Sequence, residues 1–246
     1  MKVLIPDSIP LSFPQIKSQI EFIPYSVTST DFSSVQDAEL LVLWMNSSEN
    51  LRAAVSQLHN LKLVQTLAAG PDHALNAGFP DSVAIASGRS LHDKTVTEHA
   101  LALLLHAVRN LDQLRESQNN SYWDQGYVEA QANPQTQSHY TLNGREVLIV
   151  GFGSIASQLA PVLKALGAHV RGIARNADTR ADCEILPISE ISSVLSQADV
   201  VISLMPYSAE SEKYFNQEFF NGMKNQSIFI NVGRGCLLYT SPSPRD

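Results

Sequence analysis

A glycine-rich hexapeptide carries the clearest chemical signal in the chain. Gly151-Phe152-Gly153-Ser154-Ile155-Ala156 has the form G-x-G-x-x-G/A and directly follows an apolar run at residues 147–150. In this pattern the first glycine permits a tight turn, the second lets the backbone approach a pyrophosphate, and the small last residue allows close helix–strand packing. A helix starting here also offers free N–H groups and the positive end of its dipole. The motif therefore predicts a dinucleotide-binding turn at residues 151–156.

Arg175 follows the next expected strand, at residues 170–173. NAD sites place an acidic residue at this point to hold the adenosine ribose hydroxyls, but no acid precedes Asp178 here. A guanidinium can instead pair with a 2′-phosphate. We therefore expect NADP to be preferred over NAD. The alternative is that Arg175 is a solvated surface residue and that both cofactors are accepted.

Arg234 stands between Gly233 and Gly235, directly after an apolar run at residues 227–232. Open parallel sheets place their ligand crevice at the carboxyl ends of their strands. An arginine flanked by two glycines has few side-chain neighbours to pack against, which favours a functional role. Its planar guanidinium can bind a carboxylate and polarise a neighbouring carbonyl. The position therefore predicts a substrate-binding arginine.

The elements that must position these residues alternate between strands and helices. We expect strands at residues 2–5, 20–23, 40–44 and 63–67, and a helix at 50–58 that Ser47 or Ser48 caps. A helix at residues 98–114, capped by Thr95 or Thr97, is apolar around most of its circumference, so it is predicted to be buried in the core or against a partner subunit. Residues 116–140 are expected to form an arm with little regular structure. A second α/β unit follows, with strands at 147–150, 170–173, 200–204 and 227–232 and helices at 154–166, 188–196 and 218–223.

This order predicts an α/β protein with two domains. Residues 1–93 form a flavodoxin-like, substrate-binding lobe, and residues 94–238 form a Rossmann-type, doubly wound parallel sheet that is incomplete at its C-terminus. Residues 239–246 contain two prolines and two serines where an α/β unit would enter a helix. We expect this tail to be a non-native replacement of the true continuation, the alternative being a natural frayed terminus.

The composition excludes several function classes. The 246 residues carry a net charge of −7 and no Lys/Arg cluster, which argues against nucleic acid or anionic membrane as the main partner. The two isolated cysteines, Cys183 and Cys236, lack metal-ligand spacing, so neither a metal site nor a disulfide framework is expected. No apolar run is long enough for a signal peptide or a membrane span. We expect a soluble cytoplasmic protein.

Four stretches together carry a family resemblance: residues 67–73, residues 97–110, the glycine hexapeptide, and residues 223–235. With them the chain resembles the D-isomer-specific 2-hydroxyacid dehydrogenases, which include glyoxylate/hydroxypyruvate reductases and phosphoglycerate dehydrogenases. The resemblance implies hydride transfer between a nicotinamide ring and C2 of a small 2-oxoacid or 2-hydroxyacid, and with the buried helix it suggests a homodimer.

The same resemblance implies a set of site residues. Arg234 would be the catalytic, substrate-binding arginine, and the backbone N–H groups of Ala69 and Gly70 would meet the substrate carboxylate. The cofactor would be held by the glycine turn and Arg175, with Ser154 and Ile155 at the pyrophosphate and Met205, Val232, Gly233 and Arg234 on the nicotinamide side.

The proton-transfer half of such a site is missing from the sequence. In the resembled family a histidine and its partner glutamate follow the arginine, whereas all seven histidines here precede Arg234 and no glutamate follows it. His99 and His106, on the long helix, are expected to be interior or interface residues, and His73 lies nearer the expected crevice. We therefore expect a C-terminally truncated 2-oxoacid reductase that is inactive as it stands. The alternatives are a non-catalytic NAD(P)-binding regulatory or interaction protein of the same fold, and a structural fragment.

Overall fold

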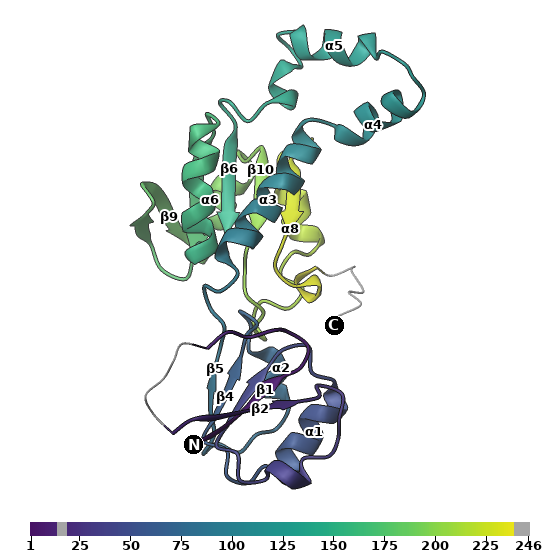
Figure 1. The fold of residues 1–246 in the computed structure, drawn as a ribbon. Helices are drawn as coiled ribbons and strands as arrows, with labels where there is room; N and C mark the ends of the chain where they lie inside the picture. The colour runs from purple at the N-terminus through teal and green to yellow at the C-terminus, as the bar shows by residue number, and fades with distance from the viewer. Residues whose placement is uncertain (14–18, 239–246) are drawn as a thin grey trace. The chain divides into compact units, whose positions relative to one another are not determined.

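The computed structural model describes residues 1–13 and 19–238. The chain divides into two compact units, Met1–His92 and Asp93–Asp246, and each is described by itself (Figure 1). The expectation about the tail at residues 239–246 lies outside the described residues.

The first unit is built on a five-stranded parallel sheet in the order β2-β1-β3-β4-β5. Its strands are β1 (Lys2–Pro6), β2 (Glu21–Tyr25), β3 (Leu40–Leu43), β4 (Leu63–Thr66) and β5 (Ala84–Ala86). The helices are α1 (Ser48–Gln57) and the short α2 (Asp72–Asn76), with a 3-10 turn η1 at Ser33–Val35. The predicted cap is Ser47, whose Oγ accepts a hydrogen bond from the Asn50 N–H at 3.0 Å. The parallel α/β class predicted from the apolar runs is confirmed.

The second unit holds a six-stranded sheet in the order β11-β10-β6-β7-β9-β8. Strands β6 (Glu146–Val150), β7 (His169–Ala174), β9 (Cys183–Pro187), β10 (Val200–Ser203) and β11 (Ile228–Asn231) are parallel, and the short edge strand β8 (Asp178–Arg180) runs antiparallel to β9. The strand order reverses at β6, as in a Rossmann sheet, where the reversal marks the ligand crevice.

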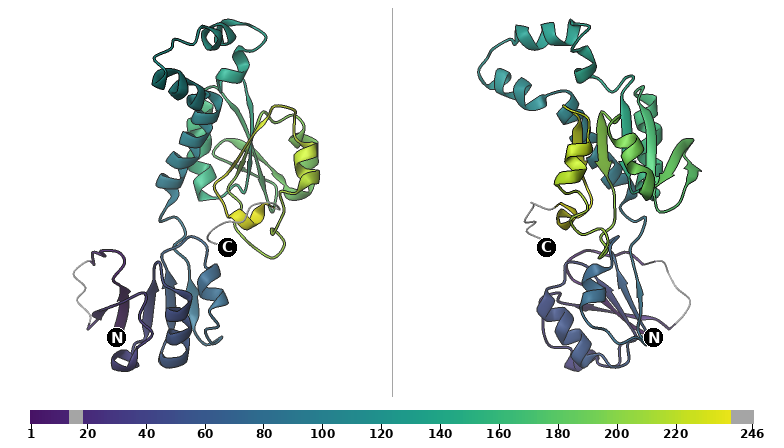
Figure 2. Two further views of the ribbon diagram at one scale, coloured as in Figure 1. Left: turned by 90° about the vertical axis from the view of Figure 1, so that its right-hand side faces the viewer. Right: turned by 180° about the vertical axis from the view of Figure 1, so that it is seen from behind.

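Helices cover both faces of this second sheet (Figure 2). On one face α3 (Asp93–Val108) and α6 (Ser154–Ala165) pack with alternate residues of the central strands in a fully buried cluster. On the other face α7 (Ile191–Leu195) and α8 (Gln217–Gly222) pack against the intervening residues, with 3-10 turns η3 at Ile188–Glu190 and η4 at Gly235–Leu237. Burial on both faces explains why the central strands read as continuous apolar runs.

The prediction of one long helix at residues 98–114 is wrong at both boundaries. α3 starts earlier, at Asp93, and a break at Asn110 separates it from α4 (Leu111–Asn119). Asn110 has a φ of +45°, a left-handed conformation that asparagine tolerates better than most residues. The sequence analysis missed this break because the apolar spacing continues across it.

The arm expected to lack regular structure is largely helical. Besides α4 it contains α5 (Gln125–Ala132) and the 3-10 turn η2 at Gln137–Tyr140 (Figure 1). Asp124 caps α5, since its Oδ1 accepts a hydrogen bond from the Tyr127 N–H at 2.9 Å. The buried Tyr127 ring packs edge-on against Tyr140, with 5.2 Å between the ring centroids. This packing and the cap stabilise a helix despite the polar composition of the segment.

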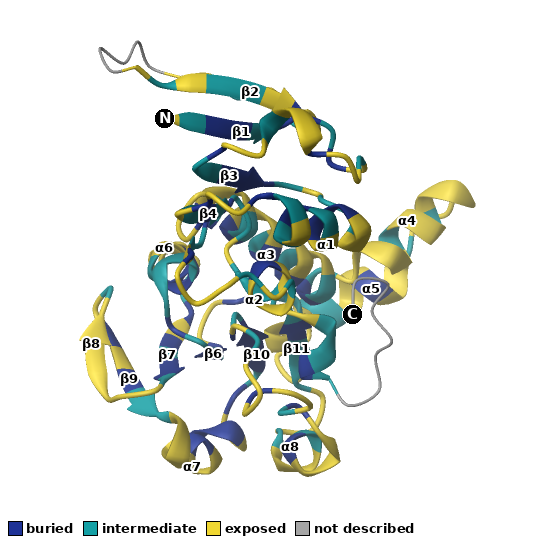
Figure 3. Ribbon diagram, turned by 90° about the horizontal axis from the view of Figure 1, so that it is seen from below, coloured by how far each residue is buried: buried dark blue, intermediate teal, exposed yellow. Residues whose placement is uncertain are grey.

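The edge strand β8 was also not predicted. All three of its residues are exposed (Figure 3), so it has no apolar alternation that would reveal a strand. Its charged side chains suit an edge position, because charge discourages pairing with another sheet.

Gly172 on β7 allows a test of the packing in the second unit. A Cβ at Gly172 would lie 2.3 Å from Phe152 Cδ2 and 2.5 Å from Ile185 Cδ1, both on buried side chains. Because these rings and chains cannot withdraw from a packed core, we expect Gly172→Ala to lower the free energy of unfolding by about 1–3 kcal/mol. Chemical denaturation measures the change.

The matched control is Gly126→Ala in α5, where an added Cβ meets only Asp124 Oδ1, at 3.5 Å. This variant should raise stability by up to about 1 kcal/mol, because alanine loses less backbone entropy in a helix. Equal effects at the two positions would contradict the packing described here.

Candidate functional site

The turn between β6 and α6 is a close approach of two backbone segments. Gly151 has a φ of +95°, and a Cβ on it would lie 2.7 Å from both the Leu204 carbonyl carbon and the Met205 nitrogen. The Gly151 and Phe152 N–H groups donate to the Ile173 carbonyl at 2.9 and 3.0 Å. Only glycine fits such a position. The first glycine of the motif is therefore required by the tight turn, as the sequence suggested.

The first turn of α6 has the features of an anion site. Its N-cap is Gly153, which has no side chain to cap the helix, and a Cβ built there meets nothing within 4 Å. Within the described part of the chain, the backbone N–H groups of Ser154, Ile155 and Ala156 have no hydrogen-bond acceptor. Three free donors, open space and the positive helix end together fit a pyrophosphate.

Ser154 has a partner that sequence reasoning missed. Its Oγ donates to Oδ1 of Asp93 at 3.0 Å, and Asp93 is only 6% exposed. Beside it, Thr97 Oγ1 donates to the Ile155 carbonyl at 3.4 Å. Both contacts tie the start of α3 to the first turn of α6. Residues about 60 positions apart give no local spacing signal, so only the fold reveals this pair.

Arg175 lies just beyond β7 and is exposed. Among the described residues, no carboxylate lies within ion-pair distance of its guanidinium. Its charge acts on Glu210: a hydrogen bond from Ser208 lowers the pKa of Glu210, and the charge of Arg175 adds to the shift. Arg175 is therefore available to a ligand at the end of β7.

A second arginine, Arg180 on β8, reaches the glycine turn itself. Its Nη1 donates to the Phe152 carbonyl at 2.8 Å, and its Nε donates to Asp178 Oδ2 at 2.7 Å. The hydrogen bond from Arg180 lowers the pKa of Asp178, which keeps that carboxylate charged. The sequence did not predict a role for Arg180, because β8 has no apolar alternation that would mark it as a strand. The charge alternation Asp-Thr-Arg was the available signal.

The Arg234 loop follows β11 and is held by Asn231. The Asn231 Oδ1 accepts from the Gly233 N–H, and its Nδ2 donates to the Arg234 carbonyl, both at 3.0 Å. A Cβ on Gly233 would lie 2.8 Å from the Met205 carbonyl oxygen, so this glycine also permits a close backbone approach. The Arg234 side chain is exposed on this rigid turn.

Met205 and Val232 occupy less open positions than the sequence analysis implied. The Met205 side chain is 8% exposed and belongs to the buried cluster with Phe215 and Leu237. Val232 packs against the cluster under α3 and α6 and donates its N–H to the Ser203 carbonyl. What these two residues present at the strand ends is therefore mainly backbone.

In the first unit, Ala69 and Gly70 lie in a bend between β4 and α2. The bend is fixed by the Thr66 Oγ1, which accepts from the Ala68 N–H at 3.1 Å, and by the Ala68 carbonyl, which accepts from the Gly88 N–H at 2.8 Å. The Ala69 and Gly70 N–H groups have no acceptor within the residues described. Two adjacent free donors on a fixed bend suit a carboxylate.

The histidines of the long helix are not interior residues of this chain. Both His99 and His106 are exposed, and the His106 Nε2 lies 2.9 Å from Asp112 Oδ2. His73 lies in α2, while His92 has its Nε2 2.9 Å from the Leu67 carbonyl and stacks on Trp44. The placement of His99 and His106 at a subunit interface stays a prediction.

The described residues contain no group of three or more His, Cys, Asp or Glu side chains that could hold a metal. In the same residues no helix is long and apolar enough to cross a membrane.

Comparison with known proteins identifies the family. Residues 101–241 match "D-isomer specific 2-hydroxyacid dehydrogenase, NAD binding domain". The chain belongs to the D-isomer-specific 2-hydroxyacid dehydrogenase family. It is 27% identical over 182 residues to the mouse glyoxylate reductase/hydroxypyruvate reductase, a match that covers 72% of this chain and 53% of the mouse protein. The matches span 56% of a Neurospora crassa formate dehydrogenase and 33% of an Arabidopsis thaliana chloroplastic D-3-phosphoglycerate dehydrogenase, so the chain covers between one third and just over half of these relatives.

Solved structures show the same fold. A family member from Aeromonas salmonicida superposes with a TM-score of 0.77 at 22% identity, covering 97% of this chain and 74% of that one. An NADPH-dependent glyoxylate/hydroxypyruvate reductase from Sinorhizobium meliloti, in complex with NADP and sulfate, gives 0.76 at 21% identity, covering 96% and 73%. The Rossmann-like α/β class expected from the sequence is thereby confirmed.

The two glycines of the turn should respond differently to alanine. Gly153→Ala adds a methyl group in open space, so the protein should keep its thermal stability while a bound phosphate is displaced. Gly151→Ala forces a side chain onto the Leu204–Met205 backbone at positive φ, and should lower stability by about 1–3 kcal/mol. Thermal unfolding and titration with ADP-ribose separate the two effects. Loss of stability in Gly153→Ala, or normal stability in Gly151→Ala, would contradict this description of the turn.

Proposed function

We propose that the protein is an NAD(P)-dependent 2-oxoacid reductase, which in the reverse direction oxidises D-2-hydroxyacids. The observation that carries the proposal lies in the second unit. The uncapped α6 N-terminus and the rigid Arg234 turn both follow strands of one sheet, and both contact the backbone at Met205 through a glycine. This arrangement supports a phosphate-binding role for the first loop and a carboxylate-binding role for the second, both at the carboxyl ends of neighbouring strands. Family membership supports the same reaction class.

The chain's own residues divide the work of binding. The N–H groups of Ser154 and Ile155 hold the pyrophosphate, and the backbone of Met205, Val232 and Gly233 borders the nicotinamide side. The bound nicotinamide supplies a hydride acceptor or donor. Arg234 binds the substrate carboxylate and polarises the adjoining carbonyl. In the first unit, taken by itself, the free N–H groups of Ala69 and Gly70 suit a carboxylate. Among the described residues we assign no side chain to proton transfer.

We infer that NADP(H) is the preferred cofactor. Arg175 is exposed and available at the end of β7, and Arg180 adds a second guanidinium that contacts the glycine turn. Asp178, the next acid along the chain, is paired with Arg180 and so is less able to accept from ribose hydroxyls. Two cations and one occupied carboxylate favour a 2′-phosphate over a free hydroxyl. The Sinorhizobium meliloti enzyme of similar fold is described as NADPH-dependent.

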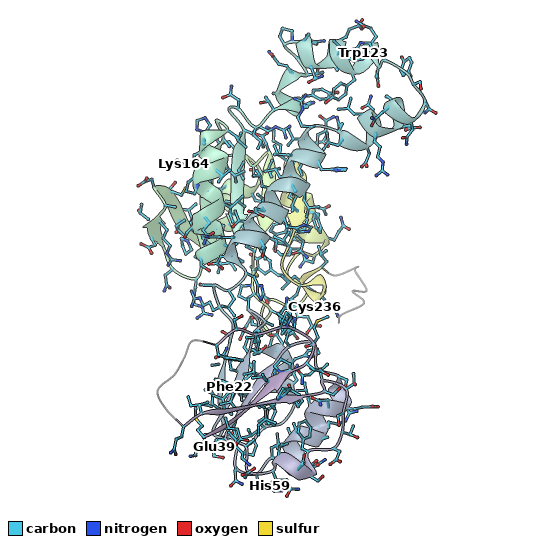
Figure 4. All side chains as sticks on the ribbon, viewed as in Figure 1. Phe22, Glu39, His59, Trp123, Lys164 and Cys236 are labelled. Atoms are coloured by element: carbon cyan, nitrogen blue, oxygen red, sulfur yellow. The ribbon has the colours of Figure 1, made fainter. Side chains whose placement is uncertain are left out.

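We further propose a homodimer formed through the second unit. Large apolar side chains lie exposed along α3, α4, the α4–α5 connection and α5, among them Leu103, Leu111, Tyr122, Trp123 and Val128. Trp123 is 77% exposed and stands out on this arm (Figure 4). Burial of such side chains against a second copy would remove the apolar surface from water.

The role of Arg234 can be tested with oxamate, a 2-oxoacid analogue that cannot be reduced, added to the protein with NADPH. Arg234→Lys keeps the charge but loses the two-pronged geometry, so oxamate affinity should fall roughly tenfold, with a smaller change in NADPH affinity. Calorimetry measures both. Arg52→Lys, at an exposed position of α1, is the control. Unchanged oxamate binding in Arg234→Lys would remove this arginine from the site.

Cofactor choice is tested by titrating NADPH and NADH against Arg175→Ala. Loss of a charge-assisted hydrogen bond should raise the NADPH dissociation constant by roughly tenfold or more, with little change for NADH. Arg52→Ala removes the same charge from an exposed position of α1 and should leave both affinities within about twofold. The preference for NADP(H) is refuted if the wild-type protein binds the two cofactors equally.

A further inference from the structure

A buried carboxylate lies beside the proposed pyrophosphate site. Asp93 is the first residue of α3, Ser154 is the first residue of α6, and their side chains are joined by a 3.0 Å hydrogen bond in which the serine donates. The neighbouring contact from Thr97 to the Ile155 carbonyl keeps the two helix starts together. A negative charge is thus fixed next to the free N–H groups of α6.

This hydrogen bond determines what Ser154 can offer to a ligand. A hydroxyl has one proton to donate. While the proton is directed to Asp93, only oxygen lone pairs of Ser154 can face an incoming phosphate, and these repel it. The Asp93 carboxylate repels the same phosphate, and burial makes the repulsion stronger than it would be in water. Asp93 and a pyrophosphate therefore compete for the same donors and the same helix end.

We propose that Asp93 is a positioning residue that limits the affinity of the α6 N-terminus for a dinucleotide by holding the Ser154 hydroxyl away from the pyrophosphate. Binding requires that hydroxyl to turn from the carboxylate to a phosphate oxygen, which leaves Asp93 without its donor. The inference rests on the proposed function, because it takes the ligand at residues 151–156 to be a dinucleotide. Its consequence is weaker cofactor binding and easier exchange than the glycine turn alone would give.

The substitution Asp93→Asn is expected to tighten ADP-ribose binding while it lowers the stability of the free protein. An amide at this position donates to the Ser154 oxygen, so the serine proton is released toward the phosphate and one negative charge is removed. The dissociation constant for ADP-ribose should fall by roughly three- to tenfold. The thermal midpoint of the free protein should fall at the same time, because a neutral hydrogen bond replaces a charge-assisted one. A purely structural role for Asp93 would lower stability and affinity together.

Two further variants keep the test decisive. Ser154→Ala leaves the carboxylate in place and removes the hydroxyl, so ADP-ribose should bind roughly three- to tenfold more weakly. Asp81→Asn removes one negative charge from an exposed position in the first unit and should leave ADP-ribose affinity within about twofold.

The outcomes separate the two levels of the proposal. The inference fails if the wild-type protein binds ADP-ribose and Asp93→Asn binds it no more tightly. It fails equally if Ser154→Ala binds as tightly as the wild-type protein, a result that needs no Asp93 variant. If the wild-type protein itself does not bind ADP-ribose, NADH or NADPH, the proposed function fails instead.

Discussion

The backbone at Leu204 and Met205 is the point on which the second unit's functional geometry depends. Gly151 packs against it after β6, and Gly233 packs against the Met205 carbonyl after β11. Because a side chain fits in neither place, three neighbouring strands end with their loops in direct backbone contact. This contact sets the start of α6 and the Arg234 turn relative to one another without any long side chain between them. The Met205 side chain packs in the buried cluster with Phe215 and so holds this stretch of backbone in place.

Groups of opposite charge lie around the glycine turn that this backbone contact holds. The α6 N-terminus offers free N–H groups, yet Asp93 stands beside it and occupies the Ser154 hydroxyl. At the far end of the turn, Arg180 is bound to the Phe152 carbonyl and to Asp178, while Arg175 is exposed. An anion meets attraction from the α6 N–H groups at one end of the turn and from Arg175 at the other, and repulsion from Asp93 beside the α6 N-terminus. Such an arrangement favours a ligand long enough to use both ends, which a single phosphate cannot do.

The sequence predicted the parts of this protein that depend on local pattern. Apolar runs buried on both sheet faces revealed the central strands, and the glycine spacing revealed the turn, since each follows from a rule that acts within a few residues. The break at Asn110 escaped prediction because the apolar spacing continues across it. The strand β8 escaped prediction because its polar residues produce no apolar alternation. The partners of the predicted residues escaped for another reason. Asp93, Arg180 and Asn231 gain their meaning from contacts that exist only after folding.

The contribution of backbone explains why side-chain reasoning alone describes this site incompletely. Met205 was expected to line the cofactor site, and its side chain is buried. What it brings is a carbonyl and an amide at fixed positions. Ala69 and Gly70 likewise have almost no side chain, and their contribution is two unpaired N–H groups held by Thr66 and Gly88 contacts around the bend. Such groups carry no record of their identity in the sequence. Substitution there is limited by the space available to a side chain, as at Gly151 and Gly233. Arg175 is exposed, so its charge can change which cofactor binds without altering the packing of the turn.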